Sequence, residues 1–205
     1  MATLRVSNVE ALNITQKTGS GIITMQTGTS IATQTPQAFT SPGQIVQARY
    51  FRTDVRANYT ASQSGDGNRI TDINLTITPK FATSLLLMQW MINGELHQDA
   101  VFVVHRDNAL VTTSGFTGYN AQGGNSRWSG MVSAFYDQNQ DSTPSNWFIQ
   151  YAAPAVTISP TIFSLAVRGS GPSDYTFSLN RTNATTGSDN YESTVSTGTI
   201  WEIAQ

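Results

Sequence analysis

The sequence contains no cysteine among its 205 residues. This absence excludes disulfide bonds and thiolate metal sites. Any stability that the protein needs outside a cell must therefore come from packing or from association between chains.

Charge is also scarce, because only 12% of the residues are charged, with 11 basic and 13 acidic side chains and a formal net charge of −2. Ordinary domains carry about 25% charged residues, so Ser, Thr, Asn and Gln must cover much of this surface. A nucleic-acid-binding protein would need a basic stripe to neutralise phosphates. We therefore expect no nucleic-acid partner.

Long hydrophobic runs are absent as well. The longest apolar stretch, "LLLMQWMI" from Leu85 to Ile92, is far shorter than the roughly 20 residues needed to span a bilayer. The start, "MATLRVSNVEALNITQ", lacks the charged beginning and apolar run of a signal peptide. We expect neither membrane insertion nor export by that route, and hence no glycosylation at the Asn-x-Ser/Thr triplets of Asn13, Asn58, Asn74, Asn180 and Asn183.

The composition changes near residue 43 and divides the chain into two regions. Residues 1–42 are rich in small polar residues and have too few apolar ones for a core of their own. They could form a disordered leader, or an extended arm that orders against partner chains. The strand-like islands "LRVSNV" and "GIITM" favour the arm, which would order only against partner chains.

Residues 43–205 alternate between apolar and polar residues in short segments, which is typical of β-strands. One such segment, "RITDINLTITP", predicts a half-buried strand that ends at Pro79. No segment keeps a helical apolar period over three turns. About nine strands separated by turn residues predict an all-β fold: an antiparallel, jelly-roll-like β-sandwich with an extended N-terminal arm.

Several strands are apolar on both faces. In "LLLMQWMI", Trp90 shares one face with Leu86, Met88 and Ile92, whereas Leu85, Leu87 and Met91 share the other. A sandwich strand needs only one apolar face, and soluble monomers rarely expose large apolar patches. Loops of the same chain or a neighbouring subunit could cover the second face, and we favour the subunit. The residues predicted for the core or the subunit interface are Leu85, Leu87, Trp90, Met91, Trp201 and Ile203.

The last strand, "STGTIWEI", is predicted to direct Trp201 and Ile203 toward the core and Glu202 outward. "AVFVVH" and "TIFSLAV" are apolar on both sides in the same way as "LLLMQWMI".

Residues suited to catalysis are few, and we assign none. In the predicted strand, His105 lies on the same face as Val101 and Val103, which favours a buried structural histidine. His97 is the other histidine. No G-x-S-x-G nucleophile motif is present. The carboxylate pairs that could serve glycoside hydrolysis lie in turns and are interpreted as solvated loop acids: Asp66 with Asp72, Glu95 with Asp99, and Asp137 with Asp141.

A calcium-loop opening, "DQNQDS" from Asp137, lacks two required residues. Ser142 occupies the glycine position and Phe148 the position of the bidentate glutamate. We therefore assign no metal and no cofactor, and expect a protein that is not an enzyme.

One loop has the composition of a ligand-binding surface. "TTSGFTGYNAQGGNSRWSG" combines aromatic rings, amides and one arginine, which suit the apolar and polar faces of a sugar. The same aromatics could instead plug one end of the sandwich. The candidate surface- or glycan-binding residues are Phe116, Tyr119, Asn120, Arg127 and Trp128.

Three blocks of the chain resemble a known family: "INLTITPKFATSLLLMQWMINGE", "VFVVHRDNALV" and "FSLNRTNATTGSDNYESTVSTGTIWEIAQ". They are similar to a β-sandwich module of tailed-bacteriophage fibre and virion-surface proteins, including those of cyanobacterial phages. The shared features are an "ITP" before a buried strand, an arginine before a polar turn, and a closing strand here written "STGTIWEI". The regions "QDAVFV" and "GYNAQGGNSRW" depart from that pattern.

The resemblance implies a bacteriophage virion structural protein, assembled in the host cytoplasm. We expect a trimeric tail fibre or knob component that contacts host surface polysaccharide. Alternatives are a capsid decoration protein that cements the head, a polysaccharide depolymerase, and a free carbohydrate-binding module.

Overall fold

The computed structural model of the chain describes residues 41–63, 65–111, 132–133, 144–169, 172–183 and 192–205. The predicted N-terminal arm falls outside these ranges except for Ser41 and Pro42. The candidate glycan-binding loop and the segment from Asp137 to Ser142 also lie outside the described residues.

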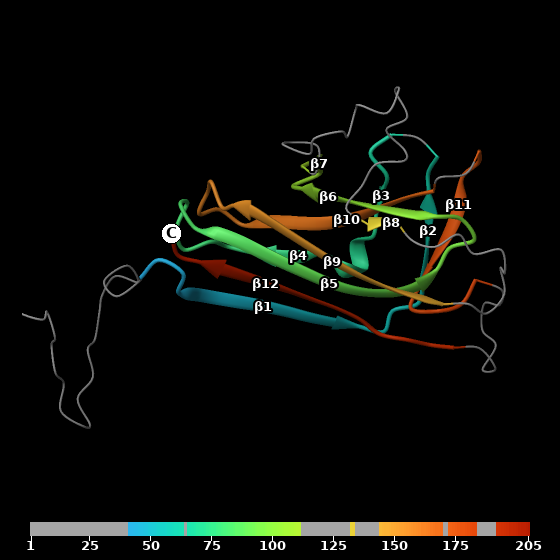
Figure 1. Ribbon diagram of the computed structural model, residues 1–205, viewed down its shortest axis with the longest axis horizontal. Coiled ribbons are helices and arrows are strands. Elements are labelled where there is room, and N and C mark those ends of the chain that lie inside the picture. The colour runs from blue at the N-terminus through green and yellow to red at the C-terminus, as the bar shows by residue number, and fades with distance from the viewer. Residues whose placement is uncertain (1–40, 64, 112–131, 134–143, 170–171, 184–191) are drawn as a thin grey trace, which may run out of the picture. The chain divides into compact units, whose positions relative to one another are not determined.

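Two β-sheets form the described part of the chain (Figure 1). Sheet A consists of β1 (Ile45–Thr53), β2 (Ala57–Ala61), β5 (Leu85–Glu95), β9 (Ser145–Pro154), β11 (Tyr175–Leu179) and β12 (Ser196–Ile203). Sheet B consists of β3 (Asn68–Arg69), β4 (Leu75–Ile77), β6 (Ala100–Arg106), β7 (Ala109–Leu110), β8 (Val132–Ser133) and β10 (Thr161–Gly169). The paired strands within both sheets are antiparallel, which confirms the predicted all-β sandwich.

Strand β5 is the centre of sheet A. Along one side it pairs with β9 over its whole length, from Leu85↔Pro154 to Gly94↔Ser145. Its other side is shared by β12 and, beyond Met91, by β11. Strand β1 continues the sheet beyond β12, and β2 does so beyond β11.

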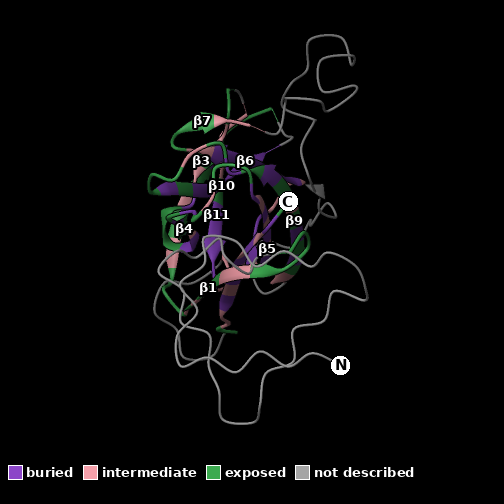
Figure 2. Cartoon of the chain, turned by 90° about the vertical axis from the view of Figure 1, so that its left-hand side faces the viewer, coloured by how far each residue is buried: buried purple, intermediate pink, exposed green. Residues whose placement is uncertain are grey.

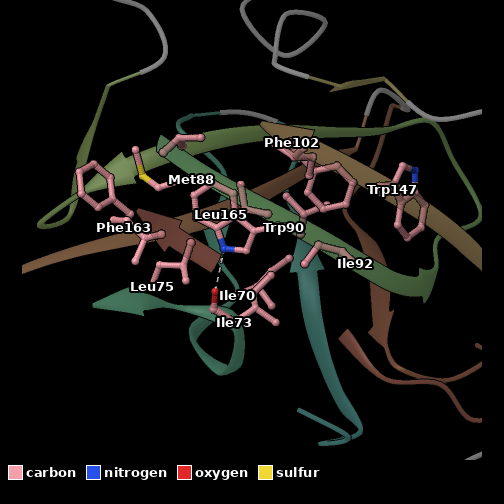
Figure 3. Close-up of a cluster of buried hydrophobic side chains, with 14 of the residues drawn as sticks. Ile70, Ile73, Leu75, Met88, Trp90, Ile92, Phe102, Trp147, Phe163 and Leu165 are labelled. Carbon is pink, nitrogen blue, oxygen red and sulfur yellow. Dashed lines mark hydrogen bonds between the residues drawn. The ribbon is translucent and has the colours of Figure 1, made fainter. Parts of the chain in front are cut away.

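The core lies between the two sheets, where the buried residues of β5, β6 and β10 face one another (Figure 2). Trp90, predicted for either the core or a subunit interface, is fully buried there, and its indole Nε1 donates a hydrogen bond to the Ile73 carbonyl oxygen at 3.0 Å (Figure 3). The rings of Phe102, Trp147 and Phe177 pack together with centroids 5.3–5.8 Å apart. The indole of Trp90 is thus packed in the apolar core while its N–H has a hydrogen-bond acceptor in Ile73.

The prediction of one continuous strand over "RITDINLTITP" is wrong. The 3-10 helix η2 (Thr71–Ile73) interrupts it between β3 and β4. Ile70 and Ile73 are both fully buried. Residues three apart lie on the same side of a 3-10 turn but on opposite faces of a strand, so the turn buries both isoleucines.

The predicted orientation of β12 is also wrong. Glu202 is fully buried, whereas Trp201 and Ile203 are only half-buried and lie on the opposite face. The carboxylate of Glu202 accepts hydrogen bonds from the backbone N–H groups of Lys80 and Phe81, which it could not reach from outside. These bonds compensate for burying a charge that alternation alone would place in water.

Strands β6 and β10 are buried on both faces, so the two-sided pattern of "AVFVVH" and "TIFSLAV" is confirmed as burial. The cover comes in part from the same chain: a Cβ added at Gly67 would lie 3.2 Å from the Ala166 Cβ. His105 on β6 also hydrogen-bonds to the Asp66 carbonyl oxygen. For these two strands, the preference for a covering subunit was wrong.

Candidate functional site

The face of sheet A that points away from the core is the candidate functional site, and we call it the outer face. The strand register places its residues in rows across β9, β5, β12 and β1. The rows are Pro154–Leu85–Ile203–Ile45, Ala152–Leu87–Trp201–Ala48, Gln150–Gln89–Thr199–Tyr50 and Phe148–Met91–Thr197–Arg52.

Strand alternation creates this face. On β5, Leu86, Met88 and Trp90 are buried in the core, so the residues between them must point the other way. The same alternation on β9 buries Trp147 and exposes Phe148. Each strand therefore contributes one side to the core and one to the outer face.

Large apolar side chains on the outer face reach solvent. Tyr50 is 65% exposed, Phe148 57% and Met91 42%. Leu87 and Trp201 are half-buried beside them. Of the predicted core or interface residues, Trp90 is in the core and the others, Leu85, Leu87, Met91, Trp201 and Ile203, are on this face.

The outer face is almost uncharged. Arg52 is the one charged residue in the four rows. Gln89, Gln150 and Thr199 form a polar row, and beyond the last row the Asn146 side-chain amide donates to the Asn93 side-chain oxygen at 3.0 Å. The rows contain no carboxylate, histidine or cysteine, and the Tyr50 hydroxyl is their one side-chain group of an acid–base type.

The size of the outer face can be compared with the sizes of ordinary surface patches and interfaces. With a strand spacing of about 4.8 Å and a rise of about 3.3 Å per residue, the rows span roughly 450 Å² in projection. The largest apolar patch of an ordinary monomer measures about 300–600 Å², and a standard interface buries about 800 Å² per partner. Because those reference figures are accessible areas, which exceed the projected area of the same side chains, the four rows are at least comparable to a large patch.

The two histidines have structural surroundings. His105 is buried, with Nε2 2.9 Å from the Asp66 carbonyl oxygen and Nδ1 3.4 Å from that of Asn108. This confirms the predicted buried structural role. The ring of His97 lies 6.0 Å from that of Tyr175.

The interpretation of the acids as solvated loop residues holds only in part. Asp72 is exposed and accepts a hydrogen bond from the Tyr59 hydroxyl at 2.6 Å. Burial, followed by this hydrogen bond, raises the pKa of Tyr59. Glu95 is fully buried at the end of β5 and accepts a hydrogen bond from the Asn183 N–H at 2.6 Å, so its interpretation as a solvated acid was wrong.

Two buried carboxylates, those of Glu95 and Glu202, and two exposed rings were missed by the sequence analysis. Glu202 was predicted to face solvent, and neither Phe148 nor Tyr50 was assigned to a surface of interest. The signal for Phe148 was present in "NWFIQYA". In this strand Trp147, Ile149 and Tyr151 point toward the core, so Phe148 must point away from it. No comparable pattern marks Glu202, because its partners come from residues 47 and 80–84.

The described residues include no group of three or more His, Cys, Asp or Glu side chains placed to bind a metal. Among the same residues, no helix is both long and apolar enough to cross a membrane. The sequence matches no protein-family model, and it has no significant match among curated proteins.

Proposed function

We propose that this protein is a non-enzymatic structural component of a bacteriophage particle, and that copies associate through the outer face of sheet A. The observation that carries the proposal is the array of partly exposed, uncharged apolar side chains on that face, including Phe148, Met91 and Tyr50. Covering them with a second copy removes apolar area from water, which favours association. The viral context is supported by the sequence resemblance described above.

The chemistry of the face favours protein over carbohydrate as the bound surface. Its first two rows consist of aliphatic side chains, proline, alanines and one tryptophan: Pro154, Leu85, Ile203, Ile45, Ala152, Leu87, Trp201 and Ala48. Aliphatic rows suit another protein's apolar surface, whereas the groups that would suit a sugar, the rings of Tyr50 and Phe148 beside glutamines, are confined to the other two rows. In this proposal host polysaccharide binds elsewhere, at the loop of Phe116 to Trp128.

The assembly proposed is a trimeric fibre or knob, as the resemblance implies. Residues 1–42 contact other virion proteins, and assembly takes place in the host cytoplasm. Three linked copies would allow weak individual contacts with a host surface to act together, because the first contact raises the effective concentration for the next.

The solution mass of the full chain tests self-association. By sedimentation equilibrium at micromolar concentration, we expect three times the 22.2 kDa of one chain. Leu87→Glu should reduce the mass to that of one chain, because it places a charge in the apolar rows. Ala109→Glu, on an exposed position of β7 in sheet B, is the matched control and should keep the wild-type mass.

Two results would contradict the proposal. A wild-type chain that stays a monomer at tens of micromolar would remove self-association, and a trimer unaffected by Leu87→Glu would remove the outer face as its site. The virion role is tested by mass spectrometry and immunogold labelling of purified particles. Steady release of reducing ends from host polysaccharide by the purified protein would contradict a non-enzymatic role.

A further inference from the structure

The loop between β9 and β10, residues 155–160, presents aliphatic side chains to solvent. Val156 is 64% exposed and Ile158 is 63% exposed. The segment "PAVTISP" contains no charged residue. Figure 1 places this loop at the same end of the sandwich as the C-terminus.

The backbone of this loop is held in place from two sides. The N–H groups of Ala155 and Val156 donate to the carbonyl oxygens of Ser84 and Ala82 at 2.8 and 2.9 Å. From β6, the Arg106 guanidinium donates to the Pro154 carbonyl oxygen at 3.0 Å and also to that of Ala155. The exposed side chains therefore project from a fixed support.

Val156 has an unfavourable backbone conformation, with φ of 55°. A β-branched residue in this left-handed region is a genuine outlier, because its Cβ crowds the backbone. The other non-glycine residues with positive φ in the described chain are Asp107, Asn108 and Asn180, which tolerate this region well. Asparagine or glycine would suit position 156 better than valine.

The isolated chain gains little from a valine at this position. Its side chain is mostly in solvent, so it adds little to the core, and it strains the turn that it occupies. Strain that persists at an exposed site points to a function outside the chain's own packing. The simplest such function is contact with a partner that covers the side chain.

We propose that Val156 and Ile158 are anchor residues of the contact between copies, seated on the aliphatic rows of the neighbouring copy's outer face. This inference rests on the proposed self-association. Pro154 belongs to the first row of the outer face and leads directly into the loop, so the loop begins at the edge of that face. The rows of the neighbouring copy leave Ile45 57% and Met91 42% exposed, so seating aliphatic side chains on them removes apolar area of both surfaces from water.

The contact would be of a loop on one copy with a sheet face on the next. Such a heterologous contact closes into a ring when the rotation between copies allows it, in agreement with a trimer. A fixed loop also loses little conformational entropy on binding, which strengthens the contact. Arg52 is the one charged residue in the rows and residues 155–160 contain none, while the Arg106 guanidinium beside the loop is hydrogen-bonded to its carbonyl oxygens.

Val156→Asn tests the inference, because asparagine accepts the left-handed backbone but removes the aliphatic contact. By analytical ultracentrifugation, the dissociation constant between copies should rise by about tenfold or more, as for an interface anchor. Ile158→Ser should act in the same direction. Val55→Asn, at an exposed aliphatic outside both the loop and the face, should leave the constant unchanged.

A folding defect is excluded by comparing Leu87→Glu with the Leu87→Glu/Val156→Asn double variant. In this dissociated background, the double variant should have an equal or higher Tm, because strain is removed. Suppose that Leu87→Glu dissociates the protein but Val156→Asn has the same dissociation constant as the wild type. That result would overturn the inference and leave the proposed function standing. A wild-type chain that is monomeric would overturn the proposed self-association, and with it the inference.

The loop could in principle meet a lipid surface instead of a second copy. Flotation with phosphatidylcholine vesicles separates the two partners. Vesicle binding that Val156→Asn abolishes, together with unchanged self-association, would overturn the inference. We expect no vesicle binding and weaker self-association.

Discussion

Replacing Glu202 with glutamine tests five hydrogen bonds that meet at one buried carboxylate. The buried carboxylate accepts bonds from Gln47 Nε2 at 2.6 Å, the backbone N–H of Lys80 at 2.8 and 2.9 Å, the backbone N–H of Phe81 at 2.9 Å, and Ser84 Oγ at 2.9 Å. These groups join β12 to β1 and to the connection between β4 and β5. The bonds fix the inward orientation of the last strand.

The magnitude follows from which bonds a glutamine can keep. Its oxygen can replace Oε1 and keep Lys80, Phe81 and Ser84 as partners, but its amide would face the Gln47 amide, donor against donor. One hydrogen bond to a charged group is worth about 1.5–3 kcal/mol, and the remaining bonds lose their charge. We therefore expect Glu202→Gln to lower the free energy of unfolding by about 3 kcal/mol at pH 7.

The effect should depend on pH. Burial by itself raises the pKa of Glu202, but the hydrogen bonds from Gln47, Lys80, Phe81 and Ser84 outweigh it and lower the pKa below its ordinary value of 4.5. A group with a lowered pKa in the folded state stabilises the fold above its unfolded pKa and loses that contribution as the pH falls through the folded one. The wild-type advantage should thus be complete at pH 7 and shrink progressively below about pH 4.5.

Urea unfolding at a fixed chain concentration, followed by tryptophan fluorescence, measures this difference. The exposed Glu192 provides the control, and Glu192→Gln should change stability by less than about 0.5 kcal/mol. A loss below about 1 kcal/mol for Glu202→Gln at pH 7 would refute the reasoning. So would a difference between wild type and variant that stays constant from pH 7 to pH 3.

Two further substitutions test the core and the close approach of its strands. Trp90→Ala should cost about 3–5 kcal/mol, because it leaves a cavity and removes the donor to the Ile73 carbonyl oxygen; denaturant unfolding yielding less than 1 kcal/mol would contradict its core position. Gly94→Ala should lower the Tm more than Gly65→Ala, since a Cβ at Gly94 would lie 2.4 Å from the backbone oxygen of Ser178, whereas at Gly65 the cost is the backbone strain of φ +72° alone, with nothing within 4 Å. A Tm for Gly94→Ala at or above that of Gly65→Ala would show that β5 and β11 separate at little cost.

Short-range patterns in the sequence predict much of this fold. Alternation in "LLLMQWMIN" places Trp90 and Leu87 on opposite faces, and β5 has them so, with Trp90 in the core. The parity of His105 with its valine neighbours predicts its burial in the same way. These predictions succeed because the side-chain period of a strand is a local property of the backbone.

Alternation states that two faces differ, but it does not state which face meets the core. In "TIWEI", apolar Trp201 and Ile203 alternate with Glu202, and hydrophobicity alone assigns the tryptophan inward. The structure reverses this orientation, because distant groups between residues 47 and 84 solvate the carboxylate inside the protein. A buried charge is allowed only by such partners, and they come together only in the folded chain.

The sequence by itself determined that this chain is all β, that several strands are apolar on both sides, and that disulfides play no part in its stability. Tertiary structure decided which second faces are already covered: β6 and β10 are buried on both sides, while β5 keeps Met91 in solvent beside Phe148. The reason is that each face is covered by segments far apart in the chain, and the apolar pattern of a strand does not specify which segment packs on it. Likewise, the strain at Val156 exists only once β9 and β10 are held in place.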